Sequence, residues 1–282
     1  MSTPSPAPTT SAAELSYVYA VGRAGTPLDG AADRAAGLDG GRLRTVHADG
    51  LVAWVSSVPR DTFSSEGMQA QLEDLERLEA IARTHHAVVE AAYACATVLP
   101  MRLATVYLDD ARVATMLQER HREFGELLSR LEDHVELGVK VYADPRETGR
   151  RDAQAPTGTL VPASPASPGR AYLQQRRAAR RSHQDAHRAA GSLAAAVPDR
   201  VAALVTARVV HRPQQAELAA AAGENIANEA YLVPANGVAG FRSALCALAD
   251  DVPGVRIEVT GPWAPYSFAT PPATAARTED PQ

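Results

Sequence analysis

The chain has 282 residues, of which 45% are apolar and 22% are charged, and its net charge at pH 7 is −5. This length and composition are typical of a globular protein with two domains and exclude a fibrous or wholly disordered chain. The negative net charge argues against nucleic acid or an anionic membrane as a partner, because both require a concentrated positive surface.

Three segments are too rich in Pro, Gly, Ser and charged residues to order themselves around a core. We expect residues 1–14 to be a disordered tail, 145–169 a flexible linker and 271–282 a second disordered tail. They separate two predicted domains, 15–144 and 170–270. The N-terminus lacks the basic and apolar regions of a signal peptide, and the sequence has no apolar run of 18 residues. A cytoplasmic protein is therefore expected.

The first domain begins with three predicted strands, which are short runs of β-branched and aromatic residues bounded by turn formers. Asp49 and Gly50 join the second strand to the third as a tight hairpin, since both residues tolerate a positive φ. The predicted strands are Ser16–Gly22, Leu43–Ala48 and Leu51–Val58.

Two helices are predicted after these strands. Apolar residues recur at steps of three and four over Glu66–Cys95. A second helix begins with Asp109 or Asp110 as its N-cap and runs to about His134.

Two more extended segments complete the first domain. Thr97–Tyr107 contains Pro100 and is either an edge strand or a strand broken by a bend. Val135–Tyr142 is expected to be the last strand of this domain. The sequence thus predicts an α+β fold with a ferredoxin-like sheet backed by two helices.

The second domain is predicted to be a smaller α+β domain opened by a long helix. This helix runs from about Arg170 to Val205, with an interruption at Pro198 as an alternative. The order of strands and helix after it echoes the first domain, but no sequence period is visible, so an internal repeat stays undecided. The remaining elements are strand Ala207–His211, a short helix or loop at Ala216–Asn225, strand Ile226–Val233, helix Gly237–Asp250 and strand Val255–Thr260.

Neither pair of histidines indicates a metal site. Adjacent helical residues such as His85 and His86 point about 100° apart, so packing or a satisfied hydrogen bond is the preferred interpretation. His183 and His187 have the spacing that can chelate one ion, but they lack an HExxH glutamate and a nearby cysteine. A solvated helix face is preferred for them.

Catalytic signatures are also missing from the sequence. Cys95 and Cys246 lie in alanine-rich stretches and are expected to be reduced, buried packing residues, with one disulfide as the alternative. Gly37–Gly41 lacks the order of a phosphate-binding loop, and the acidic residues decorate polar helix faces. We therefore expect no catalytic residue, no metal, no cofactor and no small-molecule substrate.

Two surfaces are candidates for docking another protein. Gly261–Phe268 concentrates the scarce aromatic residues between prolines, and it is either a clasp packed on the core or an exposed docking strip. A basic cluster on the long helix is a solvated face, a docking face for an acidic protein or, less favoured without interleaved aromatics, a nucleic-acid site. The candidate docking residues are Trp263, Tyr266, Phe268, Arg176, Arg177, Arg180 and Arg181, with Arg188 in the same cluster.

Seven short segments, taken in order, resemble the gas vesicle protein F/L (GvpF/GvpL) family. The last of them, GPWAPYSF, is the most specific. One departure is Leu103-Ala104, where many relatives have Phe-Gly, and it puts the local backbone in doubt. The segments are Tyr17–Gly22, Gly50–Ser56, His85-His86 with Val88–Glu90, Val98–Tyr107, Gly169–Leu173, Asn228–Val233 and Gly261–Phe268.

The resemblance implies a two-domain α+β protein that assists the assembly of gas vesicles, the cytoplasmic gas-filled protein shells that give cells buoyancy. It implies a non-enzymatic accessory or minor structural component that binds the aggregation-prone shell protein and other gas vesicle proteins. A small-ligand sensor or enzyme on a ferredoxin-like sheet is the alternative. That alternative requires a pocket in which ionisable groups converge.

Overall fold

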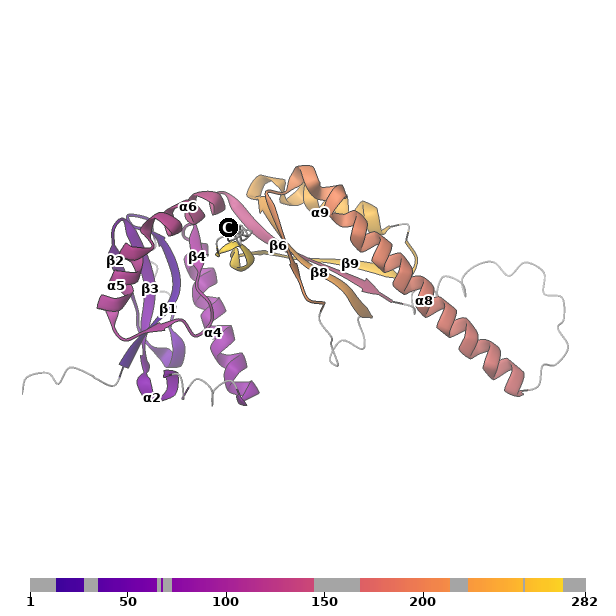
Figure 1. Cartoon of the computed structure of the whole chain (residues 1–282), viewed down its shortest axis with the longest axis horizontal. Coiled ribbons are helices and arrows are strands. Elements are labelled where there is room, and N and C mark those ends of the chain that lie inside the picture. The colour runs from indigo at the N-terminus through magenta and orange to yellow at the C-terminus, as the bar shows by residue number, and fades with distance from the viewer. Residues whose placement is uncertain are drawn as a thin grey trace, which may run out of the picture. The chain divides into compact units, whose positions relative to one another are not determined.

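The computed structural model describes residues 14–27, 35–64, 67, 73–144, 168–213, 223–250 and 252–270 (Figure 1). The chain forms two compact units. The first unit contains the residues up to Asp133 and those from Ala264 onward, and the second runs from His134 to Trp263. Nearly all of the predicted tails and linker lie outside the described residues.

The predicted domain boundaries at residues 144 and 270 are wrong. The strand expected to close the first domain, β6 (His134–Ala143), is an inner strand of the second sheet, and Ala264–Thr270 belong to the first unit. An alternating strand pattern does not say which sheet the strand joins. In the sequence, this strand precedes the long polar segment, and that position alone suggests the first domain.

The first sheet has the strand order β2-β3-β1-β4, with β5 also paired to β1, and all pairs are antiparallel. The hairpin prediction is confirmed, since Asp49 and Gly50 both have a positive φ, 45° and 75°. The extended segment at 97–107 is divided into two short strands, β4 and β5, which agrees with the predicted alternative of a strand broken by a bend. The strands are β1 (Glu14–Arg23), β2 (Leu43–Ala48), β3 (Leu51–Pro59), β4 (Val98–Pro100) and β5 (Val106–Tyr107).

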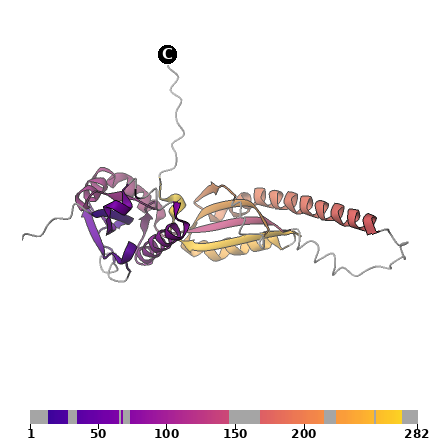
Figure 2. The ribbon, with the colours of Figure 1, turned by 90° about the horizontal axis from the view of Figure 1, so that it is seen from below.

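Helices cover both faces of this sheet (Figures 1 and 2). Helix α4 (Leu75–Tyr93) packs on one face, and α5 (Asp110–Glu119) and α6 (His121–Leu131) pack on the other. The single helix predicted after Asp109 is therefore two helices, and the sheet is enclosed rather than backed on one side. Two short pieces, η2 (Leu38–Gly40) and α2 (Arg60–Phe63), complete the unit before α4.

The second sheet has the order β7-β8-β6-β9, again with antiparallel pairs. Its chain order is strand, helix, strand, strand, helix, strand, the complete ferredoxin-like pattern. The elements are β6, α8 (Pro168–Val201), η3 (Ala202–Leu204), β7 (Ala207–His211), β8 (Glu224–Pro234), η5 (Ala235–Gly237), α9 (Val238–Ala249) and β9 (Val255–Trp263).

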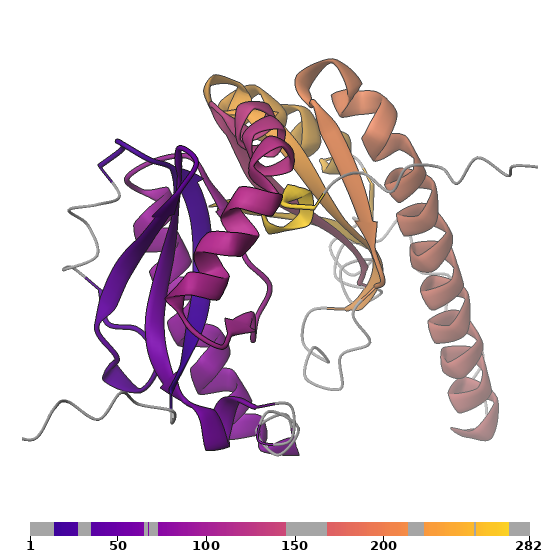
Figure 3. The same ribbon diagram turned by 60° about the vertical axis from the view of Figure 1, so that its left-hand side comes forward.

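Helices α8 and α9 both pack on one face of the second sheet (Figure 3). Their buried residues meet inward side chains of β6 and β8, such as Leu137, Val139 and Tyr231. The predicted α+β class and the long helix are confirmed, and Pro198 lies inside α8 without interrupting it. The helix does not open the unit, however, because β6 precedes it.

Candidate functional site

The aromatic segment Gly261–Phe268 is divided between the two units, since its first three residues end β9 in the second unit and the others belong to the first. Gly261 has φ +99°, and an added Cβ would lie 2.7 Å from the carbonyl oxygen of Glu136, so this turn requires glycine. Ala264 is fully buried in the first unit, and its N–H donates to Glu90 Oε1 at 3.1 Å. The chain thus returns to the first unit directly after Trp263.

Burial separates the three aromatic docking candidates. Phe268 lies in η6 (Tyr266–Phe268) and is only 3% exposed. Tyr266 is half-buried, with its ring 6.4 Å from that of His85 and 6.0 Å from that of His86. Trp263 is 41% exposed. Ala264–Phe268 therefore pack as the clasp that the sequence allowed, and Trp263 is the one of the three that presents a large accessible surface.

Burial keeps His85 neutral, and two hydrogen bonds fix its tautomer. Its Nε2 lies 3.1 Å from the carbonyl oxygen of Met101, which can only accept, so Nε2 carries the hydrogen. Its Nδ1 consequently accepts from the Tyr17 hydroxyl at 2.9 Å. Burial lowers the pKa of His85 to about 4. For His85 the expected structural role is confirmed.

The backbone at Ala104, the position where the sequence put the local backbone in doubt, is left-handed. Ala104 has φ +64°, a conformation that favours glycine over alanine. Its N–H donates to the Tyr17 hydroxyl at 3.0 Å. The left-handed turn therefore completes the hydrogen bonding of Tyr17, whose pKa is raised by burial.

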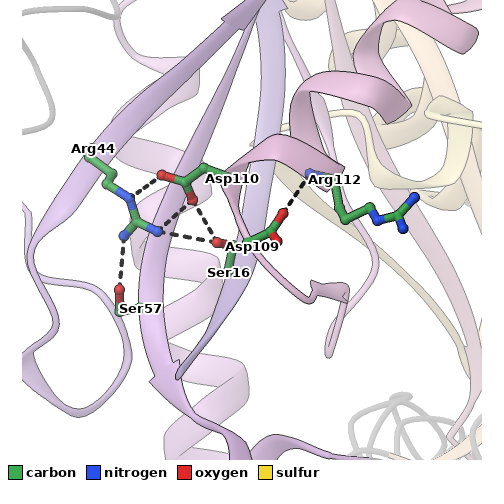
Figure 4. Close-up of polar contacts among 6 residues, drawn as sticks. All are labelled: Ser16, Arg44, Ser57, Asp109, Asp110 and Arg112. Carbon is green, nitrogen blue, oxygen red and sulfur yellow. Dashed lines mark hydrogen bonds and ion pairs between the residues drawn. The ribbon is translucent and has the colours of Figure 1, made fainter. Parts of the chain in front are cut away.

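A polar cluster fixes the start of α5 to the sheet (Figure 4). Asp110 accepts from Arg44 Nε and Nη2 at 2.8 and 2.6 Å, and from the Ser16 hydroxyl at 2.6 Å. The Arg44 guanidinium holds the pKa of Asp110 below its usual value. Asp109 is the N-cap, accepting from the Arg112 N–H at 2.8 Å. These carboxylates position a helix and are not poised for proton transfer.

Sequence reasoning missed a buried carboxylate in the second unit. The Glu229 side chain is 7% exposed, pairs with Arg208 and accepts from the Tyr231 hydroxyl. Burial and this carboxylate raise the pKa of Tyr231. The available signal was a single glutamate inside the apolar run IANEAYLV. Because all three groups are paired with one another, this set joins β7 to β8.

Helix α8 runs beyond the sheet that it packs on (Figures 1 and 2). Among the side chains of this helix that the structure describes, the first buried one is Ala186, although the helix starts at Pro168. In the projecting half Tyr172 and Leu173 are 58% and 56% exposed. The four predicted docking arginines, Arg176, Arg177, Arg180 and Arg181, are all exposed there.

The remaining metal and thiol candidates are explained by the structure. His183 Nε2 and His187 Nδ1 lie 3.9 and 3.3 Å from Glu224 Oε2. In the described part of the chain, no three His, Cys, Asp or Glu side chains are arranged to hold a metal. Cys95 and Cys246 are both free thiols, as predicted, but Cys246 is exposed, so its predicted burial is wrong.

Among the described residues, a pocket is found in each unit. The pocket of the first unit, about 380 Å³, includes Arg102, Tyr107 and Arg120 in its lining. Arg120 is already bound to Glu123 through Nε and Nη2 at 2.8 and 2.7 Å. The pocket of the second unit, about 300 Å³, lies between α9 and β9. Among the helices that the structure describes, none is long and apolar enough to cross a membrane.

Comparisons with known proteins agree on one family. Residues 15–270 match the family model of the gas vesicle synthesis protein GvpL/GvpF. The chain is 40% identical over 256 residues to gas vesicle protein L of Streptomyces sp. (strain CB03234), covering 90% of this chain and 92% of that protein. Gas vesicle protein F of the same strain is 29% identical over 260 residues, covering 89% and 98%.

Two crystal structures share the fold. GvpF from Anabaena sp. PCC7120 has a TM-score of 0.62 at 19% identity, covering 92% of this chain and 97% of that one. GvpF from Microcystis aeruginosa has a TM-score of 0.58 at 18% identity, covering 91% and 99%.

Proposed function

The chain belongs to the gas vesicle synthesis protein GvpL/GvpF family, and we propose that it binds the shell protein and other gas vesicle proteins while the vesicle is assembled. A role in gas vesicles follows from family membership. The proposal adds that this role is performed by binding in the cytoplasm, as an accessory or minor structural component, and without covalent chemistry.

The projecting half of α8 carries this proposal. A helix of 34 residues is about 50 Å long, and its described side chains are buried on the sheet from Ala186 onward. A helix that extends past its own core gives up packing energy, which is the main source of helix stability in proteins. Its exposed Tyr172 is of a residue type that often carries the binding energy of protein interfaces, and the exposed Leu173 adds apolar surface next to it.

Charge specifies the kind of partner. Helix α8 contains seven arginines and two aspartates, a net charge of +5 in a chain whose net charge is −5. Arg177, Arg181 and Arg188 are separated by four and seven residues and so lie along one helix face, with Arg188 bound to Asp185 at 2.9 Å. An acidic protein surface would complement this face, and it would associate faster at low salt.

Co-expression with the gas vesicle shell protein tests the proposal. We expect the full chain to keep the shell protein soluble and to co-purify with it. Replacing Arg177→Glu and Arg181→Glu should reduce co-purification about tenfold, because opposite charges then become like charges. The control is Arg112→Glu with Arg122→Glu, the same charge change on exposed residues of α5 and α6.

Two outcomes would contradict the proposal. One is shell protein whose solubility is the same with and without this chain. The other is a chain that binds DNA or RNA through α8 and loses that affinity steeply with salt, since nucleic acid would then be the partner of the arginine face.

A further inference from the structure

Strand β9 is the longer edge of the second sheet, and among the described residues its outer side has backbone groups without a β-strand partner. The sheet order places β7 and β9 at the two edges, with five and nine residues. In an antiparallel pair every second residue of a strand bonds to the neighbouring strand. Asp144 N–H donates to the Gly254 carbonyl, so the next residues that bond toward β6 are Arg256, Glu258 and Thr260. The N–H and C=O groups of Val255 and Ile257 therefore point outward.

One side chain already occupies the far end of this edge. Arg242 on α9 donates from Nη1 to the Val259 carbonyl at 3.1 Å and from Nη2 to the Gly261 carbonyl at 2.6 Å. These contacts confirm which groups point outward. A charged side chain of this kind protects an edge strand from pairing. Within the described residues, the outward groups of Val255 and Ile257 have no such cover.

A pocket lies beside the uncovered part of the edge. It is about 300 Å³ in volume, and α9 contributes Leu245, Cys246 and Ala249 to its lining while β9 contributes Val255 and Ile257. Most of the lining residues are aliphatic, but Asp250 and Arg256 also line the pocket, and polar and apolar atoms contribute about equally to its surface. A strand that paired with β9 would direct alternate side chains toward α9, so one of them would reach this pocket.

We propose that the outer edge of β9 at Val255–Ile257 binds an extended, apolar segment of a partner protein, which adds a strand to the second sheet and inserts an aliphatic side chain into the pocket. Alternating N–H and C=O groups select an extended backbone, and the pocket selects the side chain. This deepens the proposed function, on which it rests, by naming the form in which a gas vesicle partner is recognised.

Geometry restricts the register in which a second copy of this chain could pair at this edge to one centred on Arg256, in which Val255 of each copy lies opposite Ile257 of the other. Two β9 strands paired antiparallel about Ile257 would place Val255 of each copy opposite Val259 of the other. That register needs the Val259 carbonyl, which Arg242 occupies. A partner strand that pairs only with Val255 and Ile257 avoids this conflict.

The pocket is tested with two substitutions one residue apart. Cys246 and Ala247 are both exposed on α9, but only Cys246 lines the pocket. In the full chain co-purified with the gas vesicle shell protein, we expect Cys246→Trp to weaken binding about tenfold and Ala247→Trp to leave it unchanged. Ile257→Pro tests the edge, because it removes an outward N–H and leaves the pairing with β6 intact.

The native thiol gives an independent readout. In a Cys95→Ser chain, Cys246 is the only cysteine, and a strand seated in the pocket should slow its alkylation by N-ethylmaleimide about tenfold. Thermal melting establishes that each variant is folded. If Ile257→Pro does not fold, Cys246→Trp and the alkylation rate decide.

Each other outcome overturns the inference. One is that the Cys246→Trp chain forms the complex normally, with Cys246 of the Cys95→Ser chain as reactive in the complex as in the free chain. That result would refute this binding site and leave the proposed function unaffected. A wild-type chain that forms no complex with the shell protein would remove both. A chain that dimerises through β9 would make the occupant a second copy.

Discussion

The two units arrange their strands in the same order but cover them differently. In each sheet the first strand of the unit lies between the third and fourth, and the second strand is at an edge. The first sheet has helices on both faces, and β1 is buried at every residue from Leu15 to Gly22. The second sheet has both of its helices on one face, and β9 is half-buried from Val255 to Gly261. Strand order is thus independent of cover, and it is the second unit that has a projecting helix.

Core truncations provide the most drastic test of whether the units are separate. Phe124 in the first unit and Phe241 in the second are both buried, and replacing either by alanine should lower the stability of its own unit by about 3–5 kcal/mol. Hydrogen exchange resolved by peptide would show which amides lose protection. Equal loss of protection in both units from either substitution would mean that they unfold together.

The buried histidine makes the first unit sensitive to acid. The pKa of His85 is about 4 in the folded chain against an ordinary 6.5, so the unfolded chain takes up its proton first as the pH falls. The contribution of His85 should decrease stability by at most about 3 kcal/mol between pH 6.5 and 4, and His85 should cause no further loss below that.

His85→Gln should flatten this dependence in denaturant titrations at several pH values. His183→Gln, an exposed residue of the second unit, should not change it. A pH dependence that survives in the His85→Gln chain would show that another group is responsible.

The turn at the end of the second sheet depends on glycine. Gly261→Ala should destabilise the second unit by about 1–3 kcal/mol, because it forces an alanine to φ +99° against the Glu136 carbonyl. Gly240→Ala on α9 is the control, since its added Cβ meets nothing within 4 Å and helix propensity should raise stability by up to about 1 kcal/mol. Thermal melting distinguishes the two, and a Gly261→Ala chain as stable as wild type would refute the strain.

The smallest expected effect is a gain in the first unit. Ala104→Gly should stabilise it by about 1 kcal/mol, since φ +64° is unfavourable for alanine. The unfolding midpoint in urea reports this change. A decrease in the midpoint would mean that the loss of methyl-group packing, or the greater conformational entropy of glycine in the unfolded chain, outweighs the relief of backbone strain.

Local patterns in the sequence predicted most elements but not their partners. The strand at Leu43–Ala48 and the hairpin at Asp49-Gly50 follow from residue chemistry within a few positions. Assigning β6 to a sheet requires knowledge of contacts with β8 and β9, which are more than 80 residues away. For that reason the complete ferredoxin-like unit was missed, although each of its strands after α8 was predicted.

The candidate site was predictable to the same extent. Composition marked Trp263, Tyr266 and Phe268 as a group, but the division between an exposed Trp263 and a buried Phe268 depends on the chain returning to the first unit. The arginines of α8 could be predicted as a candidate site because charged residues are identified directly from the sequence. The edge at Val255–Ile257 was not, since an unpaired strand edge exists only once the order of strands is known.

Hydrogen exchange of the full chain, free and bound to the gas vesicle shell protein, tests most directly whether the second unit is the binding surface. We expect slower exchange in the bound chain at Val255–Val259 and along the exposed half of α8, with β1 unchanged. Slowing confined to the first unit, or a complex in which no segment of the second unit changes, would contradict this.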